Sequence, residues 1–162
     1  MSTPSSHSNQ SELPALTWQY HKPFISYWHI TAQHIDHYGH ANNVAYVSQL
    51  ERTAWAHSNA LGLSIEKYQE LDRGMAISRH EINYLAAAYL HDKIACATWI
   101  VACDSKLKLA REFQFIRPAD GACLLTARTE FICIALSSGR PKRMPQEFST
   151  PYSQAQITVV TK

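Results

Sequence analysis

One helical stripe, placed between strand-like segments, is the feature that most limits the folds open to this chain. Asn42 or Asn43 is a favourable N-cap, because a short amide side chain can accept a hydrogen bond from a free first-turn N–H group. From Asn43 onwards, apolar residues recur at steps of three and four, the spacing of one helix face. These residues are Val44, Val47, Leu50, Ala54 and Trp55. Gly62 indicates where the helix ends, so the sequence predicts one long helix between Asn43 and Gly62.

Strand-like segments lie on both sides of this helix in the chain. The aromatic and β-branched stretch of residues 21–33 precedes it, and residues 64–74 are expected to form a short second helix. Four further strands are predicted over residues 75–85, 92–104, 108–118 and 123–136. Their connections carry Asp, Ser and Gly, as short hairpins require. Because the helix must bury its apolar stripe against one face of the sheet, we expect an α+β fold in which an antiparallel sheet of about five strands wraps around one long central helix.

Length and composition predict a single domain. The chain has 162 residues, of which 46% are hydrophobic and 17% charged, as in ordinary globular proteins. Residues 1–16 are rich in Ser, Pro and Asn and are expected to be a flexible tail. Residues 17–150 are assigned to the domain, and residues 151–162 to an extension that either adds a strand or forms a tail. The net charge of +2 is too balanced to indicate nucleic acid as a partner.

The N-terminus and the cysteines indicate a cytoplasmic protein. The first residues show no cationic start followed by an apolar run, so no signal peptide is predicted. No stretch approaches 18 consecutive apolar residues, so no membrane span is predicted either. We interpret the four cysteines as reduced core thiols, because they lie among apolar residues without C-x-x-C spacing. They are Cys96, Cys103, Cys123 and Cys133.

The stretch "HIDHYGHANN", residues 34–43, carries the first candidate chemistry. Asp36 lies three residues before Gly39, which permits a tight turn, and about seven before the predicted helix. Such a turn could fold the carboxylate back towards the helix N-terminus, where unpaired N–H groups and the positive dipole end suit a polarised carbonyl oxygen. A carboxylate placed there could attack a carbonyl carbon or activate water. This is a layout for acyl transfer, and a plain turn or capping role for Asp36 is the alternative.

Histidines in the same stretch raise the question of a metal. His34, His37 and His40 follow one another at steps of three, but a zinc site needs ligands that converge in roughly tetrahedral geometry. The turn residues around Gly39 argue against a shared helix face, so we expect solvated or hydrogen-bonding histidines and neither a metal nor another cofactor. His57, on the predicted helix, is expected to be structural or on the surface.

A basic cluster is the third feature. Arg140, Lys142 and Arg143 follow the last predicted strand. They could grip phosphate groups, or they could belong to an ordinary solvated turn.

Two stretches resemble a known family. "DHYGHANNVAYVSQLERTAW", residues 36–55, closely resembles the D-x-x-G-H-x-N-N-x-x-Y signature of the hotdog-fold acyl-CoA thioesterases, the 4-hydroxybenzoyl-CoA thioesterase-like family. "SGRPKRMP", residues 138–145, resembles the GRP-x-R-x-P segment at a strand end in that family. The resemblance covers roughly residues 23–148. It implies a hotdog fold, an acyl-CoA substrate, and a homodimer or homotetramer with active sites between subunits.

The resemblance also implies roles for motif residues. By position, Asp36 matches the catalytic carboxylate and acts as general base or nucleophile, and Gly39 matches the turn glycine. Asn43 matches the residue at the helix start whose backbone N–H binds the thioester carbonyl. His40 and Asn42 are expected to hold the loop or to line the substrate pocket. Coenzyme A would lie across the subunit edge, with its phosphates near the basic cluster.

Several alternatives stay open. Some related lineages place the acid on the central helix, so Glu51 is a second candidate or a structural acid. A protein that binds acyl-CoA without turnover, and a hotdog dehydratase, are the competing functions. The acyl group itself is not predicted, since Tyr46, Trp55 and Tyr84 could line its pocket or simply form the core.

Overall fold

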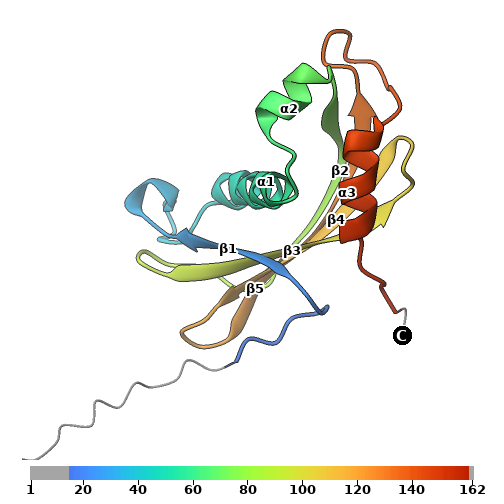
Figure 1. Cartoon of the computed structure of the whole chain (residues 1–162). Helices are drawn as coiled ribbons and strands as arrows, with labels where there is room; N and C mark the ends of the chain where they lie inside the picture. Colours follow the sequence, from blue (N-terminus) through green and yellow to red (C-terminus); the bar gives the residue numbers. More distant parts are fainter. Residues whose placement is uncertain (1–14, 161–162) are drawn as a thin grey trace, which may run out of the picture.

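The computed structural model describes residues 15–160 and contains one five-stranded antiparallel sheet that curves around a long helix (Figure 1). The strands are β1 (Phe24–His29), β2 (Gly74–Tyr84), β3 (Lys93–Cys103), β4 (Lys108–Arg117) and β5 (Ala122–Ile134), in the order β1-β3-β4-β5-β2. The helices are α1 (Asn43–Ala60), α2 (Ile65–Glu70) and α3 (Gln146–Ala155), with a short 3-10 turn, η1 (Ala32–His34). This confirms the predicted α+β arrangement of five strands around one long helix.

Helix α1 lies in the concavity of the sheet (Figure 1) and is fixed there by apolar burial. Tyr46 and Leu50 on α1 are buried together with Phe113 and Phe115 on β4. The two phenylalanines alternate with residues of the opposite sheet face, so the period-two pattern of β4 meets the helical stripe of α1. Burying side chains of this size stabilises the fold by roughly 1.5–3 kcal/mol each.

Both ends of α1 form as the sequence predicts. Asn42 is the N-cap, and its side-chain Oδ1 accepts from the Ala45 N–H at 2.7 Å. Beyond the last helical residue, Gly62 has a φ of +82°, a left-handed conformation that glycine adopts without steric strain.

The convex face of the sheet is partly covered by the chain that precedes β1. The Trp99 ring packs edge-on against Trp18 and Tyr20, with ring centroids 6.2 and 5.4 Å apart. The Trp99 Nε1–H donates to the His21 carbonyl at 2.9 Å. The Tyr20 hydroxyl donates to Glu112 on β4 at 2.7 Å. Residues from about 18 onwards are therefore packed on the domain, while most of the tail expected over residues 1–16 lies outside the described residues.

Helix α3 was not predicted. A strand or tail was expected over residues 151–162, but residues up to Ala155 are helical. Phe148 and Tyr152 are four positions apart and both fully buried, so they form the apolar stripe of this helix. Pro151 lies inside the helix, where it removes one backbone donor, and it masks the helical pattern in the sequence.

The extension ends against the sheet after α3. The Ile157 N–H donates to the Ile100 carbonyl on β3 at 2.9 Å, and Gln156 forms an isolated parallel bridge with the same residue.

Within residues 15–160, no helix combines the length and the apolar character needed to span a membrane.

Candidate active site

The Asp36 loop is a closed turn that directly precedes α1 in the chain. The Asp36 N–H donates to the His40 carbonyl at 2.9 Å, and the Gly39 N–H donates to the Asp36 carbonyl at 3.1 Å. Gly39 has a φ of +78°, so the turn requires a residue that tolerates the left-handed region. Asp36 Oδ1 accepts from the Tyr38 N–H at 2.9 Å and from the His40 N–H at 3.4 Å. The second carboxylate oxygen, Oδ2, has no protein donor among the described residues.

The start of α1 is anchored beside this loop. The Asn42 N–H donates to the His34 carbonyl at 2.8 Å, and the Ala41 N–H donates to the Ala88 carbonyl at 2.9 Å. Within the described residues, the N–H groups of Asn43 and Val44 have no acceptor, as expected for the first turn of a helix. They add the positive end of the α1 dipole to the site.

Asp36 and Asn43 line one common surface hollow, which we call the Asp36 hollow. His40, Tyr46 and Tyr84 also line it. The Tyr46 hydroxyl accepts from the Ala88 N–H at 3.2 Å, and burial raises the pKa of Tyr46, so this phenol stays protonated. The Asp36 carboxylate, with one oxygen that has no protein donor among the described residues, and the first residue of α1 therefore border the same space.

Other motif residues have clearly different surroundings. The Asn42 side chain is engaged as the helix cap and lines another hollow, between α1 and the 3-10 turn. The His40 ring packs edge-on against Tyr89 with centroids 5.2 Å apart. Gly39 shapes the turn without lining the hollow. Substrate contacts of Asn42 and His40 remain predictions.

The histidines of the motif point to different neighbours. His34 Nδ1 lies 3.0 Å from the Thr31 N–H, which donates to it, and the His34 ring packs edge-on against Trp28. In residues 15–160, no three His, Cys, Asp or Glu side chains come together in a group that could hold a metal ion.

The basic cluster lies far from the Asp36 hollow in one protomer. Arg140, Lys142 and Arg143 are exposed on the loop after β5, and this loop meets the Gly74 end of β2. The Asp36 hollow meets the opposite end of β2, at Tyr84. The eleven residues of β2 span roughly 33 Å at the usual rise of a strand. One protomer therefore cannot bring Asp36 and the basic cluster to the same short ligand.

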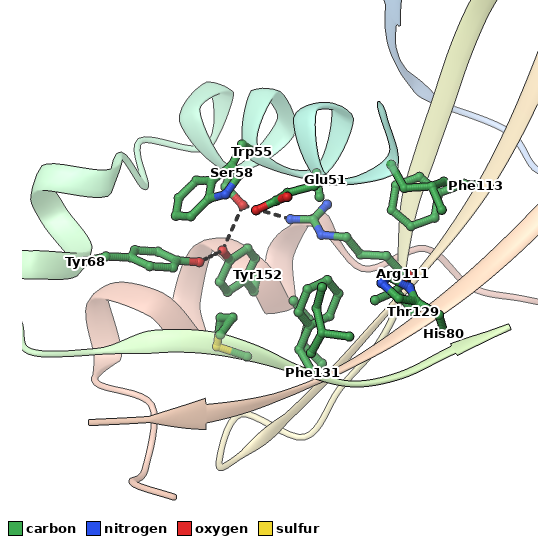
Figure 2. A pocket seen from close by; sticks show the side chains of 15 residues that line it. Glu51, Trp55, Ser58, Tyr68, His80, Arg111, Phe113, Thr129, Phe131 and Tyr152 are labelled. Atoms are coloured by element: carbon green, nitrogen blue, oxygen red, sulfur yellow. Dashed lines mark hydrogen bonds between the residues drawn. The ribbon is translucent and has the colours of Figure 1, made fainter. Parts of the chain in front are cut away.

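A second cavity, which sequence reasoning missed, lies between the C-terminal half of α1 and the sheet (Figure 2). We call it the Arg111 cavity; its volume is about 140 Å³. Arg111, on β4, is 1% exposed, and its guanidinium donates to His57 Nδ1 at 2.8 Å and to Ser58 Oγ at 2.9 Å. Ser58 is hydrogen-bonded to the Tyr152 hydroxyl at 2.9 Å, and Tyr152 is hydrogen-bonded to Tyr68.

All protein partners of this guanidinium are neutral. Burial, and then the Arg111 charge, lower the pKa of His57 to about 3, so His57 accepts from Arg111 as a neutral imidazole. Burial and the neighbouring Tyr152 raise the pKa of Tyr68, which keeps that phenol protonated. No carboxylate oxygen of the described residues lies within 4.0 Å of Arg111.

Glu51 lines the Arg111 cavity and not the Asp36 hollow. It is exposed at the edge of α1, and His80 of β2 lines the same cavity. The pKa of His80 is lowered by burial, and the charge of Glu51 offsets only part of this lowering. His80 Nδ1 lies 2.8 Å from Thr129 Oγ1. Trp55 also lines this cavity, whereas Tyr46 and Tyr84 line the Asp36 hollow.

One signal in the sequence could have found Arg111. It shares an alternating strand face with Phe113 and Phe115, both of which are buried under α1. An arginine among the apolar residues of one strand face breaks the alternation of apolar and polar residues, and this break can be seen in the sequence.

Solved structures of other proteins share the fold of this chain. No curated protein matches the chain. Among solved structures, a hypothetical protein from Staphylococcus aureus in complex with CoA is similar, with a TM-score of 0.77 and 22% identity, over 87% of this chain and 90% of that one. A 1,4-dihydroxy-2-naphthoyl-CoA thioesterase from Synechocystis has a TM-score of 0.73 and 16% identity, over 82% of this chain and 96% of that one.

A DHNA-CoA thioesterase from Staphylococcus aureus has a TM-score of 0.75 and 20% identity, over 82% of this chain and 89% of that one. These likenesses establish the shared hotdog-type fold. The profile of the Thioesterase-like superfamily matches residues 30–151, which include the Asp36 loop, all of α1 and strands β2 to β5. The chain belongs to the Thioesterase-like superfamily.

Proposed function

We propose that the protein is an acyl-CoA thioesterase that hydrolyses a thioester to a free acid and coenzyme A, with Asp36 as the catalytic carboxylate. The observation that carries this proposal is the shared hollow of Asp36 and the start of α1. Asp36 Oδ1 is held by backbone N–H groups, which leaves Oδ2 for the reaction. The N–H group of Asn43 lies at the positive end of the helix dipole, where it polarises the thioester carbonyl.

The chemistry follows from this pair of groups. Acting as general base, Asp36 takes a proton from water while the water oxygen attacks the carbonyl carbon. The oxyanion that forms is stabilised by the Asn43 N–H, and the carbon–sulfur bond then breaks to release the CoA thiolate. Acting as nucleophile, Asp36 would form a mixed anhydride that water hydrolyses. Thiols are far more acidic than alcohols, so the leaving group needs little protonation in either route.

In this proposal, self-association brings the basic cluster of one chain close to the Asp36 hollow of the other, where it can contact the CoA phosphates. Strand β2 is an edge strand, and its exposed residues include Ile77. Antiparallel pairing of β2 with its copy across a two-fold axis reverses the strand direction. This brings the partner's basic loop to the Tyr84 end of β2, beside Asp36, and the partner's Arg111 cavity to the middle of the strand. We therefore propose a homodimer, alone or paired into a tetramer, in which Arg140, Lys142 and Arg143 contact the CoA phosphates of the partner's site.

The cellular setting we propose is the cytoplasm. All four cysteines are free thiols, as expected in a reducing compartment.

The test is thiol release from a panel of short, long, branched and aromatic acyl-CoAs. Asp36→Asn is the informative variant because the amide oxygen can still accept from the Tyr38 N–H, so the turn is kept. We expect kcat to fall by about a hundredfold or more, the usual contribution of a positioned general base. Full activity in this variant would overturn the assignment.

Glu51→Gln is the matched comparison. Glu51 lies at the mouth of the other cavity, so this variant should retain kcat within a few-fold. A loss confined to Glu51→Gln would move the catalytic role to α1. Binding of several acyl-CoAs without any thiol release would instead support the non-catalytic binding protein.

A further inference from the structure

The Arg111 cavity has the features of a selective acyl pocket. We propose that it receives the acyl group of the substrate and selects acyl groups that end in a carboxylate, on a chain of about six carbons or on a single ring. This inference rests on the proposed thioesterase function. It adds a substrate class and assigns Arg111 as the residue that determines it.

Burial divides the cavity into a mouth and a base. Glu51, Ile77 and His80 are exposed and lie along the edge formed by α1 and β2. Arg111 and Tyr152 are each 1% exposed and form the buried part of the lining, where the Arg111 guanidinium lies beside Ser58 (Figure 2). A ligand that enters at the β2 edge therefore reaches the guanidinium with its far end.

The walls between mouth and base are apolar. Trp55, Phe113 and Phe131 are among the side chains that line the cavity, and they suit methylene groups or an aromatic ring. The volume of about 140 Å³ is close to the roughly 150 Å³ of an engineered cavity in another protein that binds benzene. The cavity therefore accommodates one ring or a short chain.

The charge at the base is the unusual feature. A buried cation is unfavourable unless it is paired, and buried arginines usually have a carboxylate partner. Arg111 has none within 4.0 Å among the described residues. The guanidinium donates to His57 Nδ1 and Ser58 Oγ and also has the Tyr152 side chain as a neighbour, so some of its five N–H groups remain for a ligand. A terminal carboxylate satisfies both the charge and these donors.

The groups around the guanidinium favour an anion as well. Tyr68 is kept protonated, and hydroxyl groups of Tyr68, Tyr152 and Ser58 lie in one hydrogen-bonded chain beside Arg111. The one carboxylate that lines the cavity, Glu51, is exposed at the mouth, where solvent screens it. A ligand carboxylate at the base lies beyond Glu51.

The experiment compares thioesters that differ only at the far end. Adipoyl-CoA and hexanoyl-CoA form one pair, and 4-carboxybenzoyl-CoA and benzoyl-CoA form the other. We expect kcat/KM of the wild type to be about tenfold to a hundredfold higher for at least one carboxylate member, as for a hydrogen bond to a charged group. Arg111→Leu should abolish that preference or reverse it. Equal or better turnover of both neutral members by the wild type would overturn the inference and leave the thioesterase function standing.

Controls separate specificity from folding. Arg128→Leu removes an arginine from the opposite sheet face, where it pairs with Glu112 and Glu130, and should leave the preference unchanged. Thermal unfolding of Arg111→Leu shows whether it folds, and Arg111→Gln serves as the more polar second variant. An unchanged preference in a folded Arg111 variant would refute the role of the guanidinium.

Calorimetry with free acids examines the cavity without catalysis. Adipate should bind the wild type more tightly than hexanoate does, and Arg111→Gln should remove the difference. If no thioester is cleaved but this pattern appears, the cavity assignment holds and the thioesterase proposal fails. If adipate and hexanoate bind equally, or neither binds, the carboxylate selectivity is refuted.

Discussion

Acidification is expected to destabilise the fold through His57, the buried imidazole that accepts from Arg111. His57 is 9% exposed, stacks on Phe24 at 4.8 Å between ring centroids, and has its pKa lowered from 6.5 to about 3 by burial and by Arg111. A lowered pKa means that the unfolded chain binds a proton more readily than the folded protein does. The stabilising contribution is therefore complete above pH 6.5 and is lost as the pH falls from 6.5 towards 3.

The magnitude follows from the same two pKa values. At about pH 5, the unfolded histidine is mostly protonated while His57 in the folded protein remains neutral. The difference is about 1.5 pH units at 1.36 kcal/mol per unit, or about 2 kcal/mol. This is a large fraction of the free energy of unfolding of a typical domain.

Urea unfolding at about pH 7.5 and pH 5, at fixed protein concentration, measures this contribution. His57→Asn is the comparison, because the amide oxygen can replace Nδ1 as the acceptor for Arg111 and does not titrate. The variant loses the ring stack on Phe24 at both pH values, and the remaining titrating groups are common to both proteins. The wild type should lose about 2 kcal/mol more than the variant between the two pH values. Equal losses would refute the neutral, buried state of His57.

Two further predictions concern the assembly and the motif. Asp36→Asn and Arg111→Leu chains should each be weakly active on a carboxylate-ended substrate and should regain activity when they are mixed into one dimer. In a mixed dimer, one of the two sites has both residues intact. If activity does not recover, Asp36 and Arg111 belong to a site within a single chain. Asn42→Ala should lower the free energy of unfolding by about 1 kcal/mol through loss of the helix cap, whereas Asn42→Ser should keep most of it. If Asn42→Ser loses activity at full stability, Asn42 contacts substrate directly.

The sequence predicts the elements that depend on regular patterns. The three- and four-residue spacing of apolar residues predicts α1, but two members of the predicted stripe, Val44 and Val47, are exposed, and Tyr46 packs in the core with Leu50 instead. The alternation of apolar residues predicts the five strands, because one face of each strand packs in the core. The D-x-x-G-H-x-N-N motif predicts a loop beside the helix start, and the structure brings Asp36 and Asn43 to one hollow.

Features that depend on packing between distant segments escape such patterns. Tyr152 meets Ser58 and Arg111 only after α3 folds back against the sheet, and Pro151 hides the helix that carries it. Sequence spacing likewise cannot separate Asn42 from Asn43 as the cap, since both have the same side chain. The choice is made by the Asn42 N–H, which bonds to the His34 carbonyl across the closed turn.

The position of each feature along β2 explains why the proposed site needs two chains. The Asp36 hollow meets the Tyr84 end, the Arg111 cavity takes Met75, Ile77 and His80 from the first half and the middle, and the basic loop meets the Gly74 end. A two-fold axis through the middle of β2 exchanges these ends. In such a dimer the carboxylate that we propose as catalytic in one chain faces the proposed phosphate-binding cations of the other. The roughly 33 Å of β2 that separates them in one protomer then becomes a short distance across the interface. Neither a lone protomer nor a parallel pairing of β2 brings Asp36 and the basic loop together. The Arg111 cavity lies near the middle of β2, so the mixed-dimer assay tests whether Asp36 works with the cavity of its own chain or with that of the partner.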